Sequence, residues 1–333
     1  MIPDSLKGSL TLAKSANGNL LAGTWQGGHE VFSSENGARP DAFQTWSGSS
    51  NDNVWSITKT ILGTELIGTP EGVKRKAAGA SDYTLSRVGD GAQGSLVLLG
   101  DNIFVGTWYG LFLSQDDGVS WVKTPSDCSP YDPTQWNDNP DILVPKPSDN
   151  AKYCEESVNH IEILPDGSLV AFYHGYGGAH RLVDPNNPFV ESSWESLPSY
   201  QDSEPCGSAF CLVQDAAVLN NYLYVTFQSL AMVRLDLKAA GSNWQVVSVD
   251  PAIDNLDAMA VHALDGTLYV STFQYGMYKT SDGTTWEKLS TEGCSDIPYG
   301  GLGMEDISYT ENGATVKGIV FGTQYGPWFY RAS

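Results

Sequence analysis

A short motif of glycine, threonine, an aromatic residue and a second glycine returns along the whole chain. Its clear copies are Gly23–Gly27, Gly106–Gly110, Ser271–Gly276 and Gly322–Gly326. More degenerate copies occur at Gly68–Gly72, Tyr173–Gly177 and Thr226–Ser229. Seven copies spaced by roughly 45 residues indicate one supersecondary unit repeated around a ring, because a single such unit cannot bury its apolar face alone.

The amino-acid composition indicates that the repeated unit consists of β-strands. The 333 residues are 41% hydrophobic, which is enough for a sizeable core, and they include 11% aromatic residues and 35 glycines. Amphipathic helix patterns are nearly absent, and this combination favours strands and tight turns. We therefore predict an all-β fold, a seven-bladed β-propeller of four-stranded antiparallel blades that forms a single domain.

One unit shows the strand pattern most clearly, with strands expected at 95–99, 102–108, 111–114 and 121–123. Its connections are rich in Gly, Asn and Asp, as β-hairpins require. The same pattern predicts blades at about 8–50, 53–88, 94–124, 157–198, 211–250, 255–290 and 303–333. Because the last blade supplies only three strands, we expect residues 1–7 to add the outer strand and close the ring.

Two turns between the third and fourth strands share a further motif. Ser114–Trp121 carries the full pattern Ser-x-Asp-x-Gly-x-Ser-Trp, and Thr280–Trp286 carries it with one residue deleted. These segments resemble the Asp-box repeat of bacterial neuraminidases. In that motif the Asp accepts hydrogen bonds from the turn, and Gly takes a conformation that other residues avoid. The resemblance implies the propeller fold and leaves function open, since sialidases, lectins and photosystem assembly factors all carry it.

The charge balance argues against two classes of partner, nucleic acids and anionic membranes. With 39 acidic and 18 basic residues the net charge is −21, so a nucleic-acid backbone or an anionic membrane would be repelled. No apolar run is long enough to span a bilayer, and Met1–Asp4 has neither the basic start nor the apolar core of a signal peptide. The oligomeric state is left open.

The five cysteines all fall between the predicted blades. Cys128 and Cys154 bracket one long segment, and Cys206 and Cys211 bracket a shorter one, so we expect two disulfides with Cys294 unpaired. Disulfides of this kind indicate an extracellular or otherwise oxidising compartment, whereas reduced loop cysteines are the alternative.

One face of the predicted ring gathers aromatic side chains. The turns between second and third strands lie there, together with the long insertions near 125–156, 199–210 and 291–302. Loops on a rigid ring are where propellers place binding sites, although each aromatic can also simply pack between blades. As ligand-binding candidates we take Trp25, Trp108, Tyr109, Tyr176, Tyr275 and Tyr325.

Several inner strands begin with oxygen-bearing side chains that we expect at the mouth of the central channel. The candidate metal ligands are Asn53, Asn159, Asp215, Asp257 and Asp306. Segments 158–167 and 256–261 are similar to inner strands of the paraoxonase/gluconolactonase propellers. That resemblance implies a catalytic Ca²⁺, which takes six to eight oxygen ligands. The alternative is a set of solvated or hydrogen-bonded channel residues.

Candidate catalytic residues are His160, His174 and Glu305, with His262 a weaker candidate base. Sialidase activity is not expected, because the arginines fall away from the predicted channel. The divergence of the blades favours one central site over seven equivalent ones. The sequence thus predicts an enzyme acting on a small organic or sugar-like ligand, with ester, lactone or phosphoester chemistry that a metal can assist. A carbohydrate-binding lectin and a protein-docking scaffold are the alternatives.

Overall fold

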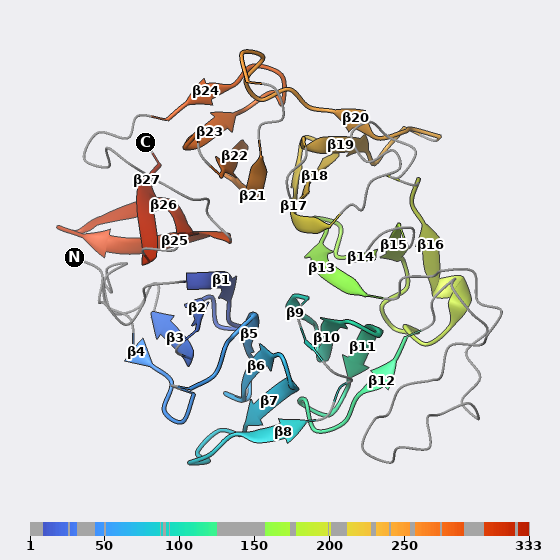
Figure 1. The fold of residues 1–333 in the computed structure, drawn as a ribbon, viewed down its shortest axis with the longest axis vertical. Coiled ribbons are helices and arrows are strands. Elements are labelled where there is room, and N and C mark those ends of the chain that lie inside the picture. Colours follow the sequence, from blue (N-terminus) through green and yellow to red (C-terminus); the bar gives the residue numbers. More distant parts are fainter. Residues whose placement is uncertain are drawn as a thin grey trace.

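Seven antiparallel sheets lie around a central axis as the blades of a propeller in the computed structural model (Figure 1). This arrangement confirms the all-β, seven-bladed prediction. The structure describes residues 9–25, 27–31, 44–49, 51–86, 88, 91–92, 94–124, 157–173, 178–198, 200, 212–227, 231–239, 241–253, 257–273, 275–289, 303–323 and 326–332. Across these ranges we find no helical segment with the length and apolar character that a bilayer crossing demands.

Each blade runs from an inner strand at the axis to an outer strand at the rim. The first four blades comprise β1 (Ser9–Lys14), β2 (Leu20–Thr24), β3 (Gly27–Val31), β4 (Gln44–Thr45), β5 (Ser56–Lys59), β6 (Glu65–Thr69), β7 (Gly72–Lys76), β8 (Thr84–Ser86), β9 (Leu96–Leu99), β10 (Asn102–Thr107), β11 (Gly110–Ser114), β12 (Val122–Lys123), β13 (Val158–Ile163), β14 (Leu169–Tyr173), β15 (Ala179–Leu182) and β16 (Trp194–Ser196). The last three comprise β17 (Val213–Leu219), β18 (Tyr222–Phe227), β19 (Val233–Asp236), β20 (Gln245–Val246), β21 (Ala258–Leu264), β22 (Thr267–Thr272), β23 (Met277–Thr280), β24 (Glu287–Lys288), β25 (Met304–Glu311), β26 (Ala314–Thr323) and β27 (Gly326–Arg331). A short 3₁₀ helix, η3 (Glu191–Ser193), precedes β16.

The ring closes where the first and last blades meet. The last blade has three strands among the described residues, and β1 contacts both β25 and β26 across this seam (Figure 1). Residues 1–7 lie outside the described ranges, so the closing outer strand stays a prediction. The five cysteines also lie outside them, and the two disulfides stay predictions as well.

Apolar packing between neighbouring blades holds the ring together. The second strand of a blade is covered on both faces, and β2 and β14 are buried along their whole length. Between blades 3 and 4, Phe104 and Leu111 pack against Ile161 and Leu169. Each such buried side chain contributes about 1.5–3 kcal/mol relative to exposure.

The Asp-box-like turn of blade 3 forms the hydrogen bonds that its sequence predicts. The Asp116 carboxylate accepts bonds from the Ser120 backbone N–H, at 2.8 Å, and from the Ser120 hydroxyl. The Ser114 hydroxyl accepts the Gly118 N–H at 2.9 Å. Gly118 has a φ of 81°, and a Cβ there would lie 2.8 Å from Leu66 of blade 2. The turn therefore fixes both the hairpin and its packing on the neighbouring blade.

Candidate functional site

A central cavity of about 900 Å³ runs between the inner strands, and all seven blades contribute to its wall. Most of the residues that line the cavity are apolar, but the lining also includes a group of titratable side chains. These are Lys14 of β1, His160 and Glu162 of β13, Asp215 of β17, His262 of β21 and Glu305 of β25. The sequence places them far apart, and the ring brings them together.

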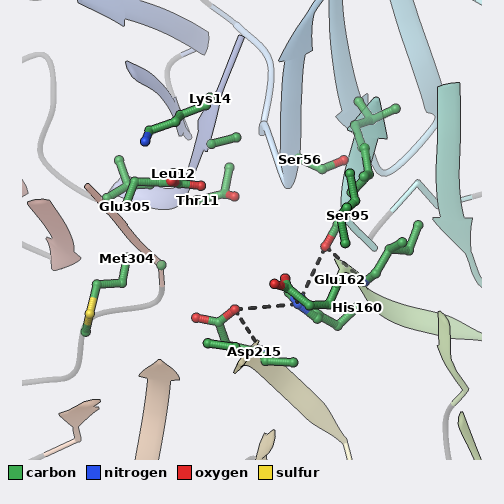
Figure 2. Close-up of a pocket in the computed structure, with 18 of the residues that line it drawn as sticks. Thr11, Leu12, Lys14, Ser56, Ser95, His160, Glu162, Asp215, Met304 and Glu305 are labelled. Atoms are coloured by element: carbon green, nitrogen blue, oxygen red, sulfur yellow. Dashed lines mark hydrogen bonds and ion pairs between the residues drawn. The ribbon is translucent and has the colours of Figure 1, made fainter. Parts of the chain in front are cut away.

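Register shifts in two inner strands set the directions of the His160 and Asp215 side chains. β13 carries a register shift between Val158 and His160, and β17 carries one between Val213 and Asp215. A β-bulge re-aims the residues that follow it. Glu162 lies two residues beyond His160 and so faces the same side of the strand. Figure 2 shows His160, Glu162 and Asp215 converging in the cavity.

His160 lies between two carboxyl groups. Its Nε2 atom is 3.7 Å from Glu162 Oε2 and 3.6 Å from Asp215 Oδ1. Its Nδ1 is joined to the Ser95 hydroxyl by a hydrogen bond of 3.2 Å. Nε2 is buried and, within the described structure, has no hydrogen-bond partner. Burial lowers the pKa of His160, and the Asp215 charge offsets this only in part, so the ring is neutral at neutral pH.

The two carboxyl groups beside His160 have raised pKa values. Burial deep in the ring raises the pKa of Glu162 to about 8, with the Glu305 charge adding to the shift. Burial raises the pKa of Asp215 to about 6, although the neighbouring His160 and the hydrogen bond from the Val261 N–H lower it in part. At pH 7 the first group is therefore mostly protonated and the second mostly ionised. The cavity thus holds a proton donor and a proton acceptor beside one imidazole.

The ionised carboxylate of Asp306 is the centre of a second set of hydrogen-bonded side chains, near the junction of the first and last blades. Asp306 accepts a hydrogen bond from Lys14 and shares one of 3.2 Å with His262 Nε2. Burial opposes ionisation of Asp306, but these two bonds outweigh it and hold the pKa of its carboxyl well below the usual value. Burial would lower the pKa of His262, yet the bond to Asp306 and the neighbouring carboxylates raise it overall.

Glu305 is the sequence neighbour of Asp306 but takes no part in the hydrogen bonds that link Asp306 to Lys14 and His262. Burial raises the pKa of Glu305, and the charges of His262 and Lys14 counteract the shift only in part. No described residue forms a hydrogen bond or ion pair with its carboxyl group. Figure 2 shows Glu305 on the same side of the cavity as Lys14, apart from His160 and Asp215.

The aromatic candidates do not share one position. Trp108 lines the cavity and is 49% exposed, and its indole lies against Gly91, where any Cβ would collide with the ring. Trp25 and Tyr275 are 63% and 39% exposed but do not line the cavity. Tyr109 packs against the core between blades 2 and 3. Tyr176, Tyr325 and the candidate base His174 lie outside the described residues.

The five predicted calcium ligands are not assembled around one point. Asn159 and Asp215 line the cavity, whereas Asn53 and Asp257 do not. The oxygens of Asp215 already accept the N–H groups of Ala216 and Val261, and Asp306 is paired with Lys14 and His262. A hard cation needs six to eight available oxygens. Calcium binding by this set of residues stays a prediction.

His262, Glu305 and Asp306 form a smaller group whose donor atoms lie within 4.8 Å of one another. A transition metal accepts one histidine and two carboxylates. Lys14 and His262 already neutralise Asp306, however, so an ion would have to displace the ammonium group.

Two members of the cavity group were missed at the sequence level. Glu162 follows His160 at the strand period of two, and this spacing could have identified it. Lys14 lies 292 residues from Asp306, and no local pattern reveals that β1 and β25 are neighbours.

Comparisons with known proteins identify the fold and no closer relationship. No family model matches the chain, and no curated protein matches it either. Among solved structures, the extracellular domain of the hybrid two-component system BT4673 from B. thetaiotaomicron is similar, with a TM-score of 0.64 and 14% identity over 98% of this chain. An ancestral GH74 enzyme is similar with a TM-score of 0.63 and 13% identity over the whole chain.

The chain corresponds to part of those two proteins, covering 39% and 46% of their lengths. YCF48 from Cyanidioschyzon merolae is similar over nearly its full length, with 97% of its chain covered, a TM-score of 0.60 and 10% identity. Identities this low establish the β-propeller and not a shared activity.

Proposed function

We propose that this chain is an enzyme that hydrolyses a small, sugar-like substrate in the central cavity. In this proposal Glu162 donates a proton and Asp215 accepts one. The supporting observation is that two carboxyl groups with different proton affinities flank the same neutral imidazole, His160. Pairs of titratable groups whose environments separate their pKa values are typical of acid–base sites.

The chemistry follows from the protonation states. Asp215, ionised at pH 7, takes a proton from a water molecule, and the resulting nucleophile attacks an acetal or carbonyl carbon. Glu162, protonated at the same pH, gives its proton to the departing oxygen. His160 is held by Ser95 and lies between the two carboxyl groups without itself being charged. Trp108 supplies an apolar face of the kind on which a sugar ring stacks.

A panel of chromogenic glycosides, esters and lactones tests the proposal. Activity should rise through about pH 6 as Asp215 loses its proton and fall through about pH 8 as Glu162 loses its proton. Glu162→Gln should lower kcat/KM by about 10²–10⁴-fold and remove the alkaline limb. Glu195→Gln, on the exposed edge strand β16, is the matched control and should change neither. Absence of turnover across the panel, or an unchanged alkaline limb in Glu162→Gln, would refute the proposal.

A lectin is the second candidate, and the exposed Trp25 and Tyr275 favour it. Both side chains lie outside the cavity lining and suit the flat faces of sugars. Glycan binding that disappears in Trp25→Ala but survives in Glu162→Gln would support this function over hydrolysis.

We also propose an extracellular or otherwise oxidising location and membership of the Asp-box group of propellers. The location is supported by the cysteine pattern and by the extracellular domains that share this fold. The group membership is supported by the hydrogen bonding of the Ser114–Trp121 turn.

A further inference from the structure

Glu305 is an acidic side chain in the cavity wall that lacks a counter-charge of its own. The cationic side chains whose charges act on it are His262 and Lys14. Both of them bond instead to the adjacent Asp306. The Glu305 carboxyl group faces the cavity and forms no hydrogen bond or ion pair with any described residue, so its oxygens can accept hydrogen bonds from a ligand.

The rest of the described cavity wall offers Glu305 no further cation. Lys14 is the only lysine or arginine along the described part of the lining, which also carries Glu162 and Asp215. With Glu162 mostly protonated at pH 7, Asp215 and Glu305 are the remaining acidic groups along this described lining, and the ammonium of Lys14 is already bonded to Asp306. The net charge of −21 on the whole chain adds a long-range attraction for cations.

We propose that Glu305 binds the ammonium group of the ligand, so that the cavity selects an amine-bearing substrate such as an amino sugar. The inference rests on the cavity of the proposed function and names its substrate class. An ammonium carries three N–H donors and no acceptor, which matches an unpartnered carboxylate. A charge-assisted hydrogen bond of this kind is about twice as strong as a neutral one.

The position of Glu305 is compatible with the acid–base group. Figure 2 places Glu305 beside Lys14 and separates it from His160 and Asp215. An amine anchored at Glu305 therefore does not occupy the part of the cavity where Glu162 and Asp215 flank His160. Trp108, half exposed to the same cavity, adds an aromatic face for the ring of the ligand.

Isothermal titration calorimetry at constant pH and ionic strength tests the inference with the full chain. The probes are the β-1,4-linked disaccharide of glucosamine, its uncharged counterpart cellobiose, and spermidine as an amine without a sugar. We expect the wild type to bind the glucosamine disaccharide at least about tenfold more tightly than cellobiose, which corresponds to about 1.4 kcal/mol. Glu305→Gln should abolish this preference, and the control Glu195→Gln should retain it.

The outcomes separate this inference from the proposed hydrolysis. Amine preference without turnover supports the role of Glu305 and removes the catalytic proposal. Turnover of uncharged substrates without amine preference supports the catalytic proposal and removes the role of Glu305. Spermidine binding that depends on Glu305, with no binding of the disaccharide, supports amine recognition and shifts the ligand from amino sugars to polyamines. Equal affinity for charged and uncharged disaccharides in the wild type, no binding of either amine, or a preference that survives in Glu305→Gln would overturn the inference. The wild-type comparison decides the matter even if the Glu305 variant does not fold.

Discussion

Replacing Glu162 with glutamine should make the protein more stable at alkaline pH. The folded-state pKa of Glu162 is about 8, above the ordinary 4.5 that applies after unfolding. Between those values the folded chain holds a proton that the unfolded chain has lost. The stability that this group contributes is therefore fully present below pH 4.5 and is lost as the pH rises through 8.

The size of this loss follows from the difference between the pKa of Glu162 in the folded and in the unfolded chain. Each pKa unit corresponds to about 1.4 kcal/mol, so a fully desolvated group would lose up to about 5 kcal/mol of unfolding free energy across it. The Glu162 side chain is 27% exposed to the cavity, and water there reduces the effect. We therefore expect about 2–3 kcal/mol. Glutamine keeps the shape of the protonated acid and cannot ionise, so this part of the pH dependence disappears.

Thermal unfolding followed by circular dichroism at pH 5 and pH 9, in buffers of equal ionic strength, measures the difference. Near pH 5 the two proteins should unfold at similar temperatures, because Glu162 is then neutral in the folded state. At pH 9 the variant should unfold a few degrees higher, since about 1 kcal/mol shifts the Tm of a 333-residue chain by roughly 1–2 °C. Glu195→Gln should follow the wild type. A Glu162 variant that loses as much Tm as the wild type between the two pH values would refute the reasoning.

Two further predictions follow from the same cavity. Trp108→Ala should weaken the binding of a sugar ligand by about tenfold or more, whereas Trp25→Ala should not, because only Trp108 lines the cavity; titration calorimetry distinguishes the two. Chelation with EDTA should leave the Tm unchanged, because the oxygens of Asp215 and Asp306 are already bonded to protein donors; a clear fall in Tm that added Ca²⁺ restores would support the calcium site instead.

The fold was accessible from the sequence because its signals are local. Turn motifs at regular spacing and runs of apolar residues repeat in each blade, and each blade packs its apolar faces against its two neighbours. The Asp116 turn illustrates this, since its hydrogen bonds run between residues four positions apart.

The site was accessible only in part. His160, Asp215 and Glu305 were placed at the channel because they stand near the starts of inner strands, and the structure brings these three to one cavity. Which residues pair could not be predicted, because pairing depends on the seam and on bulges that shift a strand by one position. Asn53 shows the consequence: it precedes an inner strand as expected, yet it is exposed and lies outside the cavity lining.

The most direct test of the acid–base site is the titration of Glu162 itself. Carboxyl-carbon NMR of the protein labelled at glutamate should show one glutamate resonance that titrates near pH 8 and is missing from the Glu162→Gln spectrum. If every glutamate of the wild type instead titrates close to the ordinary value of 4.5, Glu162 is ionised at neutral pH and cannot serve as the proton donor.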